Sequence, residues 1–317
     1  MTPVNKSLAG LLVVQVVLVG LLWRPSTEPT YAPEPVLAFD ADAITGLEIL
    51  GRTSDGETPE PVQLVKEANH WQVASAHGYP ADAAKVATVL SNLVDMQTRA
   101  PIATQAANHA KLEVAETKNT RRVQITAGAE TVELFLGAGS GSAVNVRKGD
   151  TDDVFSVRGF TAWSIGDQAS RYFDTAYVSA DVETLDSLTV INSNGNFTLE
   201  KDGTGWHIAG SEEGTLVNET KIQELLSAVT QVRMTEPAGK TAPPAWGLTR
   251  DHRVEWTSAD GDESSGSGYT IGAEVDGKVY VKADANPFVV RVTSSTVAKA
   301  LAINVEELLL NPDVDNG

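Results

Sequence analysis

Apolar residues recur with the same helical spacing in two distant stretches of the chain. The spacing i, i+3, i+4, i+7 places each set on one face of a helix. The two sets are Val86, Val89, Leu90 and Leu93, and Ile222, Leu225, Leu226 and Val229. Asp82 precedes the first run and Asn218 the second, and both residue types are good helix N-caps. The pattern predicts two amphipathic helices at equivalent places in two similar units.

Short alternating runs, separated by Gly, Asp and Asn, surround each predicted helix. In the first unit they lie at residues 46–51, 61–66, 71–74, 123–126, 131–136, 143–147 and 154–158. Such runs favour antiparallel hairpins, and a helix between groups of strands favours an α+β layer in which the helix packs on the sheet. Trp71 in "HWQVAS" and Trp206 in "GWHIAG" are expected to anchor sheet to helix in the core. A ligand-stacking role is the alternative for both.

Further blocks recur in the same order. "RRVQIT" at Arg121 resembles "HRVEWT" at His252, and "ADAITGLEIL" at Ala41 resembles "ADVETLDSLTVI" at Ala180. Two shorter matches pair Leu136-Gly137 with Ile271-Gly272, and "FSVR" at Phe155 with "FVVR" at Phe288. Conserved order along the chain indicates a tandem duplication. We predict one α+β repeat over 39–174, a second over 175–311, and a short tail over 312–317.

The segment "KSLAGLLVVQVVLVGLLWRP" near the amino terminus has only Ser7 and Gln15 as clearly polar residues between Lys6 and Arg24. A buried soluble helix would show a polar face, and a cleaved signal peptide would show small residues at its cleavage site. The pattern therefore favours a transmembrane signal anchor over 1–24, of roughly 25 Å. A proline-rich linker over 25–38 follows it. The distribution of Lys and Arg favours a cytoplasmic amino terminus, with everything after Trp23 outside the cytoplasm.

Charge and cysteine content narrow the functional classes. The formal net charge is −18, which disfavours binding to nucleic acid or to anionic lipid head groups. The chain contains no cysteine, which excludes disulfides, thiol catalysis, cysteine-ligated zinc and iron–sulfur clusters. Hydrophobic residues make up 42% of the chain, enough for a sizeable core.

Motifs that carry chemistry are weak. The glycines at 137, 139 and 141 in "LGAGSGSAVNV" suit a phosphate loop or a hairpin turn, and the strand-like residues after them favour the turn. Acidic clusters beginning at Gly149, Ser258 and Asn311 match no complete calcium loop and are expected to be solvated turns. The histidines are His70, His77, His109, His207 and His252, with no metal-binding spacing among them, and no GxSxG motif occurs. We therefore predict no catalytic, cofactor-binding or metal residue, and we assign no ligand-binding residue.

Several of these stretches also resemble a known family. They are "HWQVASAHGYPADAAKVATVLSNL", "GWHIAGSEEGTLVNETKIQELLSAV", "AWGLTRDHRVEWT" and "YTIGAEVDGKVYVKADANPFVVRV". Together they resemble the bacterial domain-of-unknown-function 4340 family, present in two copies from about Phe39 to Leu309. The first copy departs from the second because it lacks the Trp-Gly-Leu found at Trp246.

The resemblance implies a membrane-anchored, extracytoplasmic protein that accompanies ABC-type transporters of the gliding-motility kind. With the predicted anchor, it implies a single-pass protein of a bacterial inner membrane whose C-terminal bulk lies in the periplasm. Its expected partners are the transporter permease and auxiliary subunits, together with the inner membrane. No catalytic residue comes with the family. The first hypothesis is therefore a non-enzymatic accessory subunit. The alternatives are a free-standing periplasmic binding module for a polymer or peptide, and a hydrolase without a recognisable motif.

Overall fold

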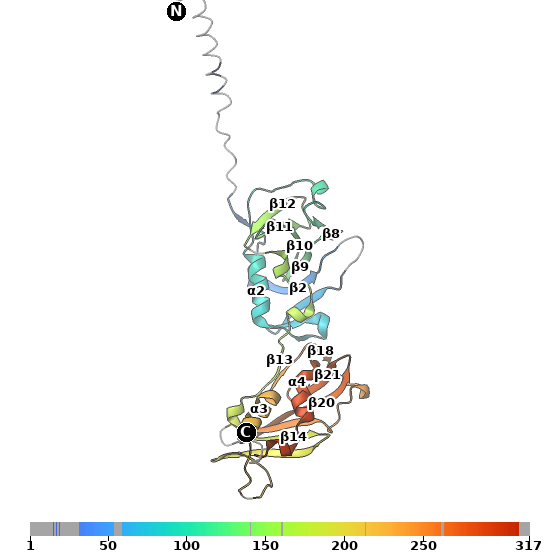
Figure 1. Ribbon diagram of the computed structural model, residues 1–317. Coiled ribbons are helices and arrows are strands. Elements are labelled where there is room, and N and C mark those ends of the chain that lie inside the picture. Colours follow the sequence, from blue (N-terminus) through green and yellow to red (C-terminus); the bar gives the residue numbers. More distant parts are fainter. Residues whose placement is uncertain are drawn as a thin grey trace, which may run out of the picture.

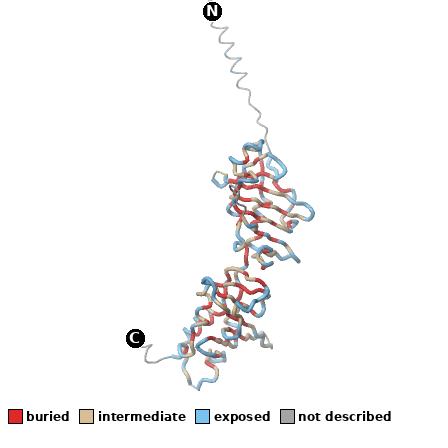
Figure 2. Tube along the Cα trace, turned by 90° about the vertical axis from the view of Figure 1, so that its right-hand side faces the viewer, coloured by how far each residue is buried: buried red, intermediate tan, exposed pale blue. Residues whose placement is uncertain are grey.

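A computed structural model describes residues 15, 17, 19, 32–53, 59–139, 141–159, 161–212, 214–260 and 263–310 (Figures 1 and 2). The predicted anchor and the tail after residue 310 lie almost wholly outside these residues. Within the described residues, no helix is long and apolar enough to cross a membrane.

The protein is an α+β protein with two large antiparallel sheets. The first sheet has the strand order β12 (Val154–Arg158), β11 (Ala143–Lys148), β10 (Glu130–Ala138), β9 (Arg121–Ala127), β2 (Ile44–Leu50), β3 (Val62–Glu67), β4 (His70–Val73), β5 (Tyr79–Pro80). The alternating runs predicted in the first unit all form strands of this sheet. The glycine-rich stretch joins β10 to β11, so it is a hairpin connection, as predicted.

The second sheet has the strand order β16 (Gly205–Ile208), β15 (Gly195–Asp202), β14 (Leu185–Asn192), β19 (Arg253–Asp260), β20 (Glu263–Val275), β21 (Lys278–Ala283), β22 (Val289–Thr293), β18 (Glu236–Gly239). From β4 to β12 and from β16 to β22, the two sheets have the same arrangement of successive strands. This shared topology supports the duplication inferred from sequence. We call residues 34–174 the first repeat and residues 175–310 the second repeat.

One amphipathic helix is built into each repeat, and a further helix follows β22. They are α2 (Ala83–Val94), α3 (Glu219–Thr230) and α4 (Ser294–Ala302). The apolar positions predicted for α2 and α3 are all buried. The Asp82 side chain accepts hydrogen bonds from the backbone of Ala84 and Lys85, and that of Asn218 accepts one from Lys221. Both predicted caps are therefore confirmed.

The remaining elements are 3₁₀ turns and short strand pairs. The turns are η1 (Ala41–Ala43), η2 (Ala74–Ala76), η3 (Ala106–Asn108), η4 (Ala162–Ser164), η5 (Ala169–Arg171), η6 (Val182–Thr184), η7 (Pro244–Trp246) and η8 (Val305–Leu308). The pairs are β1 (Glu34–Pro35) with β6 (Gln97–Thr98), β7 (Val114–Ala115) with β8 (Lys118–Asn119), and β13 (Ala176–Ser179) with β17 (Gln231–Arg233). The β7–β8 hairpin lies where the first copy departs from the second in sequence.

The end of the predicted linker belongs to the fold. Strand β1 pairs with β6, the backbone N–H of Val36 donates to Met96 O at 3.0 Å, and Val36 and Leu37 are each only 3% exposed. The folded part therefore begins by residue 34 rather than at residue 39. Burial of two apolar side chains directly after the proline-rich stretch accounts for the difference.

One sequence match has the wrong register. Strand pairing aligns Val146 with Phe155 in the first repeat, and Val281 with Val290 in the second. Since Leu136 pairs with Val146 as Ile271 pairs with Val281, Phe155 is equivalent to Val290, and Phe288 is equivalent to Asp153. The predicted pairing of Phe155 with Phe288 is off by two positions. A shift of two keeps every side chain on the same face of a strand, so alternation alone cannot detect it.

The two repeats pack against each other at the predicted boundary. The backbone N–H of Asp174 donates to Pro80 O in the first repeat, whereas Thr175 O accepts from Met234 in the second. The ring of Tyr79 makes edge contacts with Phe173 at 5.8 Å and with Phe288 of the second repeat at 5.1 Å. Core residues of both repeats form one contiguous cluster, and buried segments run through both halves in Figure 2.

Candidate functional site

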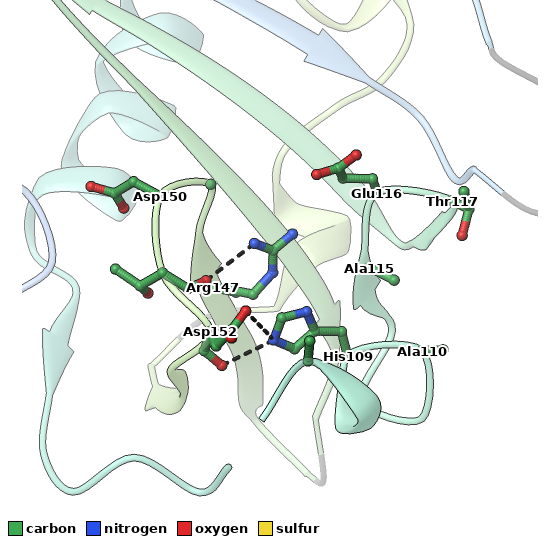
Figure 3. Close-up of a pocket in the computed structure, with 11 residues that line it drawn as sticks. His109, Ala110, Ala115, Glu116, Thr117, Arg147, Asp150 and Asp152 are labelled. Carbon is green, nitrogen blue, oxygen red and sulfur yellow. Dashed lines mark hydrogen bonds and ion pairs between the residues drawn. The ribbon is translucent and has the colours of Figure 1, made fainter. Parts of the chain in front are cut away.

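A polar cavity of about 510 Å³ lies in the first repeat, beside the β11–β12 turn (Figure 3). His109 is 7% exposed, and its Nε2 lies 2.9 Å from Asp152 O and 3.9 Å from Asp152 Oδ1. Arg147, Glu116 and Asp150 also line the cavity. Asp150 and Asp152 belong to the acidic cluster predicted to form a turn, and the backbone N–H of Thr151 donates to Lys148 O there.

Arg147 is the most chemically distinctive residue of this cavity, since only 5% of it is exposed. Its guanidinium donates to the backbone oxygens of Val114, Lys148 and Thr151 at 2.9, 3.2 and 3.2 Å. It also lies 4.3 Å from the Phe135 ring centroid, in a cation–π contact.

The second repeat shows what Arg147 does. Lys282 occupies the equivalent position. Arg147 pairs with Val154 in the first repeat, and Lys282 pairs with Val289, the equivalent of Val154, in the second. Its ammonium group donates to Ala283 O at 2.8 Å and to Asn286 O at 2.6 Å. Both repeats thus place a cation where it bonds the carbonyls of the turn after this strand. Arg147 is therefore accounted for as a turn-stabilising residue.

A second polar cavity, of about 300 Å³, surrounds Arg253 on the second sheet. Arg253 forms ion pairs with Asp284 and Glu255, and the hydrogen bonds that its guanidinium donates to the Asp284 carboxylate raise the pKa of Arg253. In the first repeat the equivalent Arg122 pairs with Glu133 instead. Each repeat pairs an arginine at this strand position with acidic side chains: Glu133 of the adjacent β10 in the first repeat, and Glu255 of β19 together with Asp284, just after β21, in the second. This pattern indicates a structural ion pair.

A third cavity, of about 500 Å³, lies beside Trp206, between η6, the β15–β16 hairpin and the start of α3. Its lining combines apolar Trp206 and Ile222 with charged Lys201, Glu183 and Glu219. Lys201 Nζ lies 5.9 Å from the Trp206 ring centroid and donates to Glu183 O at 2.9 Å. An apolar wall with a few polar groups is typical of ligand sites. This arrangement can hold an apolar or aromatic group of a ligand.

Trp71 and Trp206 pack against the core, as predicted, but both remain partly exposed. Trp206 therefore contributes to the core and to the wall of a cavity. The packing of both Trp side chains on the core was predicted from sequence, whereas their residual exposure depends on how the helix and hairpin pack.

The structure brings together one pair that the motif search missed. The hydroxyl of Ser193 and Nε2 of His252 lie 3.0 Å apart at an exposed turn. Activation of a serine also requires a group that orients the histidine. Among the described residues, no carboxylate bonds the other ring nitrogen of His252, so the pair is not a triad. Within the same residues, no group of His, Asp or Glu side chains is arranged to hold a metal ion.

Two large antiparallel sheets that share an arrangement of successive strands, together with three helices in the described residues, define an α+β protein. The chain belongs to the family described as Domain of unknown function (DUF4340), whose model matches residues 71–251, more than half of the chain. The match begins in β4 and ends before β19, so a single match spans parts of both repeats. No curated protein and no solved structure matches the chain.

Proposed function

We propose that this protein is a non-enzymatic, membrane-anchored accessory subunit of an ABC-type transport system, acting through contacts with proteins or cargo. The observation that carries the proposal is the apolar segment between Lys6 and Arg24, placed ahead of two packed repeats. A tether raises the effective concentration of the repeats near a membrane partner, and two repeats offer two contact surfaces. The ABC-type partner comes from the family resemblance in the repeated stretches.

The proposed location is a bacterial inner membrane, with one pass and with the repeats in the periplasm. Lys6 precedes the apolar segment, and after Arg24 no Lys or Arg occurs before Arg52. This bias favours a cytoplasmic amino terminus. We also propose that each repeat is one copy of the family's domain, since the sheets share their strand order.

Co-purification tests the proposed partner. The full chain, extracted in mild detergent, is expected to retain an ABC-type permease and its ATPase through washing. The matched control carries residues 1–38 fused to an unrelated soluble domain, which keeps the anchor and removes the repeats. Equal recovery of the permease with both proteins, or with neither, would contradict the proposal.

The anchor itself gives a second prediction. The mature protein is expected to keep its amino-terminal segment, because no small-residue cleavage site follows the apolar core. Intact-mass measurement of the protein purified from membranes checks this. A mature amino terminus between Trp23 and Phe39 would show that the segment is a cleaved signal peptide.

The cavity beside Trp206 favours a second candidate, a free-standing periplasmic binding module for a polymer or peptide. Its apolar wall and its volume of about 500 Å³ suit a side chain or sugar ring of such a ligand. This candidate predicts that the repeats, separated from the membrane and from any transporter, bind the ligand with unchanged affinity. Loss of ligand binding on removal of the anchor would argue against this candidate.

A further inference from the structure

Two arginines line a cavity of about 440 Å³ in the first repeat, where β6 and β12 lie against each other. Gln97 belongs to β6, and Arg99 follows that strand directly. Ser156 and Arg158 point to one side of β12, because alternate residues of a strand share a face. These four residues form the lining, and we call them the arginine pocket.

The two arginines carry charge that no acidic side chain balances. Arg99 and Arg158 are exposed, and neither forms an ion pair within the described part of the chain. Glu34 of β1 pairs with Thr98, so it points away from the face that carries Gln97. The acidic turn over 150–153 precedes β12, at the opposite end of that strand from Arg158.

The second repeat balances the equivalent charge. Strand register makes Ser156 equivalent to Arg291, whose guanidinium donates to the Glu236 carboxylate at 2.9 Å. Ala100 stands in the place of Glu236 in the first repeat. Each of these two residues lies three positions before the one that pairs with the first residue of the neighbouring strand, β12 or β22. The first repeat therefore lacks the acid that neutralises this surface in the second.

The equivalent surfaces also face different surroundings. In the second repeat this end meets the first repeat, since a Cβ at Gly239 would lie 3.9 Å from Nδ1 of His77 and the Phe288 ring packs on Tyr79. The arginine pocket lies at the other end of the first repeat. Strand β6 pairs there with β1, the first strand of the described chain, and Figure 1 shows β12 at that end. The pocket is thus beside the place where the chain enters the fold.

The distance from the proposed anchor to this place is limited by the chain. Residues 25–33 separate Arg24, at the end of the apolar segment, from Glu34 of β1. A fully extended chain rises by at most about 3.6 Å per residue, so β1 lies within about 35 Å of that end. A tether this short keeps the pocket at a high effective concentration of lipid headgroups.

Phosphate is the anion that matches the pocket. Guanidinium groups donate paired hydrogen bonds to phosphate oxygens, and the Gln97 amide and the Ser156 hydroxyl add neutral donors. The net charge of −18 opposes attraction of the whole chain to an anionic surface. A contact with such a surface therefore needs a local site where cations are unopposed, and the arginine pocket provides one.

We propose that the arginine pocket binds the phosphate of a phospholipid headgroup in the membrane that holds the anchor. This contact sets the orientation of the first repeat on the membrane and directs the second repeat away from it. The inference rests on the proposed membrane anchor, and it goes beyond the proposed transporter contact.

Fluorescence quenching in reconstituted vesicles tests the proposal. The full chain contains no cysteine, so Ala100→Cys gives one labelling position beside Arg99. A fluorophore at this position is expected to be quenched by a phosphate-free nitroxide lipid in vesicles of phosphatidylethanolamine and phosphatidylglycerol. Arg99→Gln and Arg158→Gln are each expected to lower the ratio of docked to undocked protein about fivefold. Arg250→Gln removes an exposed arginine of the second repeat and is expected to leave the ratio unchanged.

Two further arms identify the source of the anion. Vesicles of digalactosyl diacylglycerol, a lipid without phosphate, are expected to give the low quenching of the Arg99→Gln protein. Inorganic phosphate, compared with chloride at equal ionic strength, is expected not to displace the protein from phospholipid vesicles. Displacement by inorganic phosphate would show a site for the free anion and overturn the lipid assignment.

Three other results would also overturn the proposal. They are equal quenching with and without lipid phosphate, equal ratios for Arg99→Gln and Arg250→Gln, and low quenching that rises with Glu28→Gln, which would place a linker carboxylate in the pocket. A chain that retains the permease but shows no phosphate-dependent docking would remove the lipid contact and leave the proposed function standing. Docking without retention of the permease would support the lipid contact and remove the transporter.

Discussion

Leu226→Ala is expected to lower the free energy of unfolding by about 2–5 kcal/mol. Leu226 is fully buried on the apolar face of α3 and belongs to the contiguous hydrophobic core. Truncation removes apolar contacts and leaves a cavity that the surrounding helix and sheet cannot fully close. Denaturant unfolding of a soluble fragment starting at residue 32, which keeps β1, measures the change.

Leu216→Ala is the control for this prediction. Leu216 is 65% exposed and lies just before the same helix, so its truncation is expected to change stability by no more than about 0.5 kcal/mol. Leu90→Ala, on the equivalent face of α2, is expected to fall in the same range as Leu226→Ala, because Leu90 is 7% exposed. Losses under about 1 kcal/mol at both helices would mean that these faces are not packed in the folded protein.

Gly272→Ala is expected to destabilise the second repeat by about 3 kcal/mol, the upper end for overpacking. A Cβ at residue 272 would lie 2.2 Å from Trp246 O and 3.1 Å from a methyl group of Leu248. The nearest obstacle is backbone, so η7 would have to move away from β20. Gly137, the equivalent residue, faces Leu112 O in the same way, at 2.1 Å from the Cβ position. Both repeats therefore require glycine at this position, because a backbone carbonyl oxygen lies where a Cβ would stand.

Gly266→Ala tests whether the effect comes from this close approach. Gly266 lies on the same strand as Gly272, and a Cβ there would meet no atom within 4 Å. We expect a change within about 0.5 kcal/mol. The thermal midpoints of the two variants, compared with that of the unaltered fragment, give the answer. Equal midpoints for Gly272→Ala and Gly266→Ala would show that loops around η7 relax without cost.

The helices and most strands of the first repeat were readable from sequence because their signals are local. Val86, Val89, Leu90 and Leu93 lie within one segment, and their spacing alone specifies a buried helix face. Asp82 and Asn218 act on backbone N–H groups two or three residues away. Comparison of the repeats added the order of blocks, and hence the duplicated topology.

The candidate sites were much less predictable. Ser193 and His252 are distant in sequence and meet only because β14 and β19 are neighbours. The cavity beside Trp206 forms where a turn, a hairpin and a helix meet, and no single segment encodes that arrangement. The role of Arg147 became clear only when the strand register showed that Lys282 is its equivalent in the other repeat.

Sequence by itself determined the α+β class, the repeat, the helix faces and their caps, since each depends on residues close together or on one half resembling the other. Only the tertiary structure decided that Glu34 to Leu37 join the fold, that Phe155 matches Val290, and that Leu216, Leu309 and Leu310 remain uncovered. These features depend on which surfaces meet. Burial depends on how elements pack. A run of apolar residues therefore has the same sequence pattern whether another element packs on it or it faces water.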